Sequence, residues 1–143
     1  MRLIEPDFLD QEEIAYLLKT PHGLHKLKSS SNPVVDKVVE RLRRHFNFEI
    51  NSNSYWRIEE RPDGHDWHKD TGSNDHMLWC QVGVSILLTN NFTGGETFYA
   101  DDAGETNVVK QNRKIGDLCA HTSTEWHMVT PHQGRRTVFL MFI

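Results

Sequence analysis

Three side chains of the sequence have the chemistry and spacing of a metal site: His68, Asp70 and His127. Residues two positions apart on a β-strand point to the same face, so the imidazole of His68 and the carboxylate of Asp70 can reach one point. His127 lies much later in the chain, beside Trp126 and just before an apolar C-terminal segment. Two histidines and one carboxylate form the facial triad that holds iron(II) in non-haem oxygenases, although zinc also accepts such a set in hydrolases.

The facial arrangement suits oxygenase chemistry because it leaves coordination positions free. Three protein ligands on one face of an octahedral iron leave three open positions, of which a bidentate 2-oxo acid takes two and O₂ takes one. The cofactors predicted from this set are therefore Fe(II), 2-oxoglutarate and O₂. The ligands alone do not distinguish iron from zinc, so another residue has to decide.

Arg135 and Arg136 precede a C-terminal segment that is otherwise almost wholly apolar. A charged group at the start of a buried strand is costly unless it is paired. If Arg136 faces inward, so do the alternate residues of the strand, which are Val138, Leu140 and Phe142. An inward guanidinium can hold the distal carboxylate of 2-oxoglutarate through two parallel hydrogen bonds, whereas a zinc hydrolase has no particular use for it. The alternative is that both arginines are solvated at a turn, which we expect of Arg135 rather than of Arg136.

The first third of the chain predicts two helices. Asp10 and Glu13 have the spacing of a capping box at the start of a short amphipathic helix. Asn32 followed by Pro33 is typical of a second helix start, and an apolar stripe follows. Residues 20–31 are rich in Ser, Gly, Pro and His, and we expect them to form a loop.

Beyond residue 48 the pattern changes to short apolar runs separated by turn signals rich in Asn and Gly. The runs expected to form strands lie in Tyr55–Glu59, Leu78–Leu88, Glu96–Tyr99, Asp117–Ala120 and Arg136–Ile143. Such strands indicate a mainly β jelly roll, with the two helices packed on one of its sheets. We expect a single domain over residues 1–143, with a helical part at 8–48 and a β core at 54–143.

Composition and charge limit the partners. The chain has 143 residues, of which 37% are apolar and 25% charged, and its net charge is −4. These values are ordinary for a globular protein and give no reason to expect binding to nucleic acid or to an anionic membrane. The first residues lack the apolar core of a signal peptide, and no apolar run is long enough to span a membrane, so a cytoplasmic location is expected. Cys80 and Cys119 are expected to be buried thiols.

Four stretches of the sequence have a recognisable order and spacing. They are FLDQEE at 8–13, GGETF at 94–98, IGDL at 115–118 and HMVTPHQGRRTVFLMFI at 127–143. Together with His68-x-Asp70, they resemble the 2-oxoglutarate- and Fe(II)-dependent dioxygenases, and most closely their prolyl 4-hydroxylase-like branch. The resemblance covers almost the whole chain and implies a double-stranded β-helix, the cupin-like form of the jelly roll.

The resemblance also implies roles for individual residues. The residues implied to bind iron are His68, Asp70 and His127, and Arg136 would bind the far carboxylate of 2-oxoglutarate. Many members place a tyrosine on the strand before the first ligand to help hold 2-oxoglutarate, and the candidates here are Tyr55 and Trp56. Collagen-type enzymes have lysine where this chain has Arg136, so the resemblance favours the bacterial and oxygen-sensor-like branches.

The reaction and substrate follow from the resemblance alone. It implies hydroxylation of an unactivated C–H bond, with ascorbate as a reductant, by a monomer or a homodimer. A prolyl residue of a peptide is the first candidate substrate, and a free amino acid or other small molecule is the alternative. A macromolecular substrate would be held by the loops expected at 60–80 and 100–114.

Two other classes of protein remain open on the sequence. A cupin-like metal-binding module without turnover would not need Arg136 and would not consume 2-oxoglutarate. A zinc hydrolase would be active with Zn²⁺ and indifferent to O₂. The extra imidazoles of His121 and His132 are expected to be exposed or satisfied by neighbours rather than to bind metal.

Overall fold

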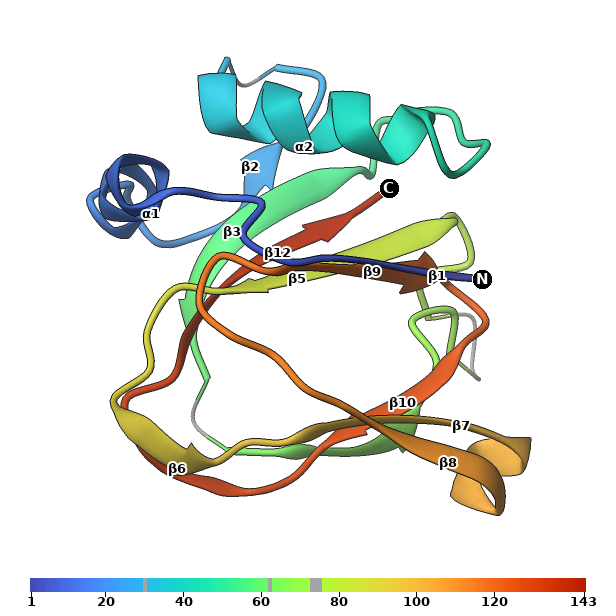
Figure 1. Cartoon of the computed structure of the whole chain (residues 1–143). Coiled ribbons are helices and arrows are strands. Elements are labelled where there is room, and N and C mark those ends of the chain that lie inside the picture. The colour runs from blue at the N-terminus through green and yellow to red at the C-terminus, as the bar shows by residue number, and fades with distance from the viewer. Residues whose placement is uncertain (30, 62, 73–75) are drawn as a thin grey trace.

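Two antiparallel β-sheets face each other in the computed structural model, which describes residues 1–29, 31–61, 63–72 and 76–143 (Figure 1). The larger sheet has the strand order β1-β9-β5-β12-β3-β2, and the smaller sheet has the order β4-β10-β7-β8. A third pair, β11 and β6, lies at one end of the molecule. This arrangement confirms the predicted jelly roll.

The strands are short, as expected for this fold. Those of the larger sheet are β1 (Arg2–Glu5), β9 (Leu118–Thr122), β5 (Val82–Leu87), β12 (Thr137–Phe142), β3 (Tyr55–Glu60) and β2 (His25–Lys26). Those of the smaller sheet are β4 (His65–His68), β10 (Trp126–Val129), β7 (Thr97–Asp101) and β8 (Thr106–Gln111). The remaining pair is β11 (His132–Gly134) with β6 (Phe92–Gly94), and a short 3₁₀ helix covers Asp102–Gly104.

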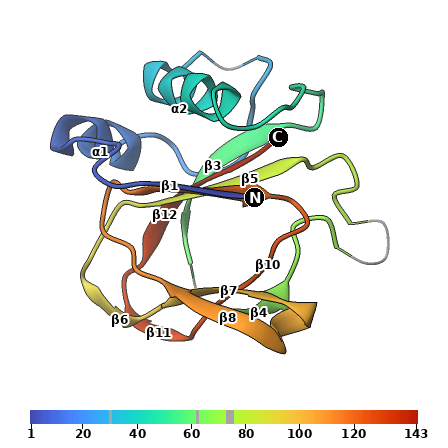
Figure 2. The same cartoon turned by 45° about the vertical axis from the view of Figure 1, so that its right-hand side comes forward.

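Both predicted helices are present and pack on the outer face of the larger sheet (Figures 1 and 2). Helix α1 (Gln11–Leu18) begins with the complete capping box of Asp10 and Glu13. Helix α2 (Pro33–Arg43) begins at Asn32, whose side chain accepts hydrogen bonds from two backbone amides. Within the described part of the chain, no helix is long and apolar enough to cross a membrane.

Strand β12 shows how the larger sheet divides the interior in two. Its side chains alternate, so Phe139 and Met141 pack in the hydrophobic core under the helices. Val138, Leu140 and Phe142 face the space between the sheets and line a cavity there, together with Arg136. The core therefore stabilises one face of the sheet, while the other face is left for a site.

Three parts of the backbone differ from expectation. Strand β1 was not predicted, because only four residues pair with β9 and two of them are charged. Strand β2 lies inside the loop expected at 20–31 and has two residues. Strand β8 occupies much of the loop expected at 100–114, where it pairs with β7 although its side chains are mostly exposed and carry no apolar alternation.

The other loop expected to hold a large substrate, at 60–80, also contains a strand. Strand β4 covers its residues 65–68, Glu60 ends β3, and the other described residues belong to no helix or strand. Residues 62 and 73–75 of this expected loop lie outside the described residues. Both segments contribute side chains to a cavity between the sheets, among them Lys69, His76 and Arg113, so their role in holding a large substrate stays a prediction.

Candidate metal centre

The three predicted ligands converge between the sheets. One nitrogen or oxygen atom from each of His68, Asp70 and His127 lies within 4.8 Å of the other two. His68 ends strand β4 and is the register partner of His127 on β10, which brings the two imidazoles together. Asp70 lies in a bend beyond the end of β4, so the expectation that His68 and Asp70 share one strand face is wrong.

Hydrogen bonds from the next residue hold the bend that carries Asp70. The backbone amide of Thr71 donates to the carbonyl of Ser123 at 3.2 Å, and its hydroxyl donates to the carbonyl of Cys80 at 3.1 Å. These contacts tie the bend to segments on two sides. The carboxylate therefore reaches the histidines through a fixed turn instead of through strand alternation.

Both histidines present the same nitrogen to the centre of the site. The Nδ1 atom of His68 lies 2.7 Å from the carbonyl oxygen of Asp66, and that of His127 lies 2.9 Å from the carbonyl oxygen of Glu125. A carbonyl oxygen only accepts, so each Nδ1 carries the proton and donates it. Each Nε2 then has a free lone pair, which is the state in which an imidazole binds a metal.

The spacing of the ligand atoms suits one ion. The Nε2 atom of His127 lies 3.4 Å from Oδ1 of Asp70. Two ligands that each lie about 2.1 Å from a metal, at roughly a right angle, are about 3 Å apart. Neither atom carries a proton in the tautomer described above, so a cation between them satisfies both.

Electrostatics keep the ligands ready to bind a cation at neutral pH. Burial, followed by the nearby His127, lowers the pKa of His68 from 6.5 to about 4, so its imidazole is neutral. Burial alone would raise the pKa of Asp70, but the pKa lies below its ordinary value, and the hydrogen bond from His121 is the largest cause that lowers it. The site thus offers the neutral imidazole of His68 and the ionised carboxylate of Asp70.

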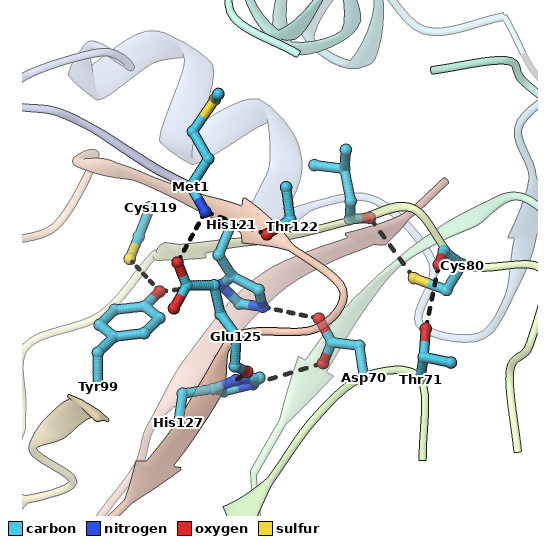
Figure 3. Close-up of polar contacts among 11 residues, drawn as sticks. Met1, Asp70, Thr71, Cys80, Tyr99, Cys119, His121, Thr122, Glu125 and His127 are labelled. Atoms are coloured by element: carbon cyan, nitrogen blue, oxygen red, sulfur yellow. Dashed lines mark hydrogen bonds and ion pairs between the residues drawn. The ribbon is translucent and has the colours of Figure 1, made fainter. Parts of the chain in front are cut away.

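A third histidine, His121, holds the carboxylate in place, as Figure 3 shows. Nε2 of His121 donates to Oδ2 of Asp70 at 2.7 Å, which leaves Oδ1 for the metal. The other ring nitrogen of His121 accepts from the hydroxyl of Tyr99 at 2.9 Å, and the same hydroxyl lies 3.2 Å from Sγ of Cys119. The expectation that His121 is a satisfied imidazole is confirmed. Sequence reasoning missed its partner, because Asp70 lies far away in the chain.

Gly83 on strand β5 makes room for this pair. A Cβ atom at that position would collide with Oδ2 of Asp70 and would lie 2.9 Å from Nε2 of His121. We predict that Gly83→Ala pushes the carboxylate out of place and weakens metal binding about 10- to 100-fold, the usual range when an outer contact of a metal ligand is lost. Titration with Co(II), followed by its ligand-field absorption, measures the change.

A second glycine at the same cavity provides the control. A Cβ atom at Gly72 would meet the side chain of His76 at 3.5 Å, an ordinary contact. Gly72→Ala should therefore bind Co(II) like the parent protein. Equal affinities of the Gly83→Ala variant and the parent would show that Asp70 can relax without loss, against the prediction.

The ligands open into a cavity of about 540 Å³ between the sheets. Arg136 lines it, on the same face of the sheet as Val138, Leu140 and Phe142, in the period-two pattern expected from the sequence. Its side chain is buried at 3% exposure, and its Nε has no hydrogen-bond partner. Burial, and then the charges of Arg113 and Arg61, lower the pKa of Arg136 from 12.5 to about 10. Gly95 of the GGE motif makes room for this side chain, because a Cβ atom there would lie 2.9 Å from it.

A second arginine, Arg113, reaches the same end of the cavity and was not predicted. Its guanidinium donates to the hydroxyl of Ser85 at 2.9 Å and to that of Thr97 at 3.3 Å, while its Nε is buried without a partner. Among the described residues, no acidic side chain pairs with Arg113 or Arg136. Arg113 lies in a polar stretch between two strands, so the sequence carries no signal that it faces inward.

Tyr55 and Trp56, the two candidates for a further cosubstrate contact, point to opposite faces of β3. Tyr55 lines the cavity and lies close to Phe142. Trp56 is 2% exposed in the helix-side core, where its ring stacks on that of His25 at 4.2 Å. Trp56 therefore cannot contact a cosubstrate in the cavity, because strand alternation allows only one of two neighbouring residues to face it.

Arg135 pairs with Glu60 on the surface at 3.2 Å, as expected for a solvated residue.

Comparison with known proteins identifies the fold. The sequence matches no protein-family model, and no curated protein matches it significantly. Among solved structures, a Pseudomonas putida prolyl-4-hydroxylase has a TM-score of 0.72 at 12% identity, over 99% of this chain and 83% of that one. An oxidoreductase of the 2OG-Fe(II) oxygenase family from Burkholderia pseudomallei has a TM-score of 0.65 at 16% identity, over 99% of this chain and 82% of that one.

A third structure is a prolyl hydroxylase from Trichoplax adhaerens in complex with a hypoxia inducible factor oxygen degradation domain peptide fragment. It has a TM-score of 0.64 at 16% identity, over 99% of this chain and 82% of that one. At these identities the likeness concerns the fold. The chain thus has the fold of 2OG-Fe(II) oxygenases, prolyl hydroxylases among them, which is the fold that its motifs imply.

Proposed function

We propose that the protein is a 2-oxoglutarate- and Fe(II)-dependent oxygenase that hydroxylates an unactivated C–H bond. One observation carries the proposal: a single cavity holds a His-Asp-His ligand set and a buried arginine that has no acidic partner among the described residues. Neither a zinc hydrolase nor a metal-binding module without turnover accounts for Arg136. A 2-oxo acid with a distal carboxylate accounts for both features.

The residues that hold each component follow from the geometry. His68 and His127 would bind iron through Nε2, and Asp70 through Oδ1. Asp70, which would bind the metal, lies against Gly83, the register partner of Phe142 at the far end of β12, whereas Arg136 directly precedes the first residue of that strand. 2-Oxoglutarate can therefore reach from the metal along β12, with its distal carboxylate held by Arg136 and, beside it, Arg113.

When bound, iron(II) with 2-oxoglutarate and O₂ supplies the oxidative decarboxylation that yields succinate and CO₂ and oxidises a C–H bond. The protein orients these components and excludes water. His121 fixes which oxygen of Asp70 faces the metal, and the hydroxyl of Tyr99 fixes the tautomer of His121. Val138, Leu140 and Phe142 give the cavity an apolar wall, which favours the exclusion of water.

The proposed substrate is a prolyl residue of a peptide, with a free amino acid as the alternative. Support comes from two of the similar structures, which are prolyl hydroxylases, one of them bound to a peptide fragment. The cavity supports both candidates. It is large enough for 2-oxoglutarate and part of a second molecule, and its 540 Å³ is within the usual range for small-molecule sites.

The test is succinate formation from 2-oxoglutarate by the parent protein, with Fe(II), O₂ and ascorbate. We expect turnover that depends on iron and oxygen and stops when Zn²⁺ replaces Fe(II). A slow reaction without a primary substrate is sufficient, because uncoupled decarboxylation needs only Fe(II), 2-oxoglutarate, O₂ and the ascorbate that reduces the oxidised iron. Hydrolytic activity with Zn²⁺, or binding of Fe(II) without any consumption of 2-oxoglutarate, would contradict the proposal.

A further inference from the structure

The walls of the cavity carry more positive charge than the cosubstrate can neutralise. The cations that line it are Arg57, Arg61, Lys69, Arg113 and Arg136, and the acids are Glu59 and Asp70. Without counting the histidines, five positive charges face two negative ones. A divalent metal adds two positive charges and 2-oxoglutarate adds two negative ones, so the excess of three remains. Arg136 is buried and the other four cations are half-buried, so part of this excess lies away from water, where an unpaired charge is costly unless another anion enters.

Two of the cations, Arg61 and Lys69, already have partners in the protein. Arg61 forms an ion pair with Glu59 at 3.0 Å, so these two charges cancel. The ammonium of Lys69 lies 5.2 Å from the ring centre of Trp126, where a cation–π contact stabilises it. Neither side chain therefore requires an anion in the cavity.

Arg113 and Arg136 form a second group. The side chain of Arg136 packs against Gly95, and Arg113 donates to the hydroxyl of Thr97, so the two guanidiniums reach the same part of the cavity wall. A carboxylate placed between them accepts hydrogen bonds from both. The distal carboxylate of 2-oxoglutarate fills this role under the proposed function.

Arg57 is the remaining cation of the cavity wall. It lies on β3 on the same face as Tyr55, and its register partner on β12 is Leu140, between the level of Gly83, which lies against Asp70, and that of Arg136. Its Nε is buried without a hydrogen-bond partner. In the described ranges of the chain, no acidic group forms an ion pair with Arg57. A guanidinium so placed faces whatever shares the cavity with the cosubstrate.

We infer that the substrate oxidised at this site carries a carboxylate, which Arg57 binds. The inference rests on the proposed function and adds the chemical class of the substrate to it. A bidentate pair between a guanidinium and a carboxylate would orient the substrate in the cavity as well as neutralise the charge. The carboxylate has two possible sources: a small free acid, or an acidic side chain beside the target residue of a peptide.

Matched ligand pairs that differ only in this charge test the inference. The first pair is N-acetyl-L-proline and N-acetyl-L-proline amide. The second is a proline-containing hexapeptide, blocked at both ends, with either Asp or Asn next to the proline. Each is titrated calorimetrically into protein loaded with 2-oxoglutarate and Mn(II), which occupies the site without turnover. We expect the acid of at least one pair to bind about 10- to 100-fold more tightly than its neutral partner, the usual range for a charge-assisted hydrogen bond.

Variants then assign the preference to one residue. Arg57→Gln should remove most of the preference for the acid while 2-oxoglutarate still binds, and Arg57→Lys should keep part of it. Arg135→Gln is the control, because it removes the same charge from an arginine that pairs with Glu60 outside the cavity. Thermal unfolding of each variant shows whether the fold is intact.

The outcomes separate this inference from the proposed function. A preference in the first pair identifies a free acid, and a preference in the second identifies an acidic neighbour in a peptide. The inference is overturned if neither acid binds more tightly than its neutral partner, or if Arg57→Gln keeps the full preference. Failure of 2-oxoglutarate itself to bind the Mn(II)-loaded protein would instead contradict the proposed function.

Discussion

Replacing His127 by alanine is expected to abolish succinate formation and to weaken Fe(II) binding by more than about 100-fold, since even outer contacts of a ligand contribute 10- to 100-fold. The variant keeps one histidine and one carboxylate, too few to hold the ion against water. Asp70 also loses its neighbour at 3.4 Å, so its carboxylate is free to turn. Binding is measured by anaerobic titration and turnover by succinate release.

The control for this variant is His45→Ala. His45 is exposed just after helix α2 and does not line the cavity, so its loss removes an imidazole without touching the site. Both variants should unfold at nearly the same temperature in the absence of metal. The ligand assignment fails if His127→Ala still binds Fe(II) as tightly as His45→Ala does.

Residue types and the His-x-Asp motif indicated the three candidate ligands in the sequence, although the strand-face argument for His68 and Asp70 was wrong. Two histidines and an aspartate have few common roles together, and Arg136 at the head of an apolar strand needed an internal partner. The same logic identified both helices, whose caps depend on residues at most three positions apart. Where the chemistry is local, the sequence was sufficient.

The features that sequence reasoning missed depend on contacts between distant segments. His121 and Asp70 meet only because β9 lies beside β5, where Gly83 leaves room for them. Arg113 faces inward from a stretch with no periodicity. Asp70 turns toward the histidines through a bend fixed by Thr71, which the strand pattern does not contain.

The sequence alone also does not decide which of Tyr55 and Trp56 faces the cavity. A strand has two faces, and a shift of one residue exchanges them. Both residues are aromatic, so neither hydrophobicity nor size decides which one faces the cavity. Pairing of β3 with β12 decides it, because Met141 faces the core opposite Trp56.

Arg136→Ala is expected to raise the dissociation constant for 2-oxoglutarate about 100-fold or more, because a buried bidentate pair with the distal carboxylate is lost. The comparison ligand is 2-oxopentanoate, which keeps the 2-oxo acid end and lacks the distal carboxylate. Its affinity should hardly change, so the preference for 2-oxoglutarate should largely disappear. Titration of both ligands into the Mn(II)-loaded variant, with Arg135→Ala as control, measures the preference.

The ratio of the two affinities distinguishes a direct role of Arg136 from a structural one. A general loosening of the cavity would weaken both ligands alike and leave the ratio unchanged. Arg136→Lys should restore part of the ratio, since lysine keeps the charge but not the two parallel hydrogen bonds. If Arg136→Ala keeps the full preference while Arg113→Ala loses it, the carboxylate is held by Arg113. The burial of Arg136 would then require a different anion, and the substrate carboxylate assigned to Arg57 would be the first candidate.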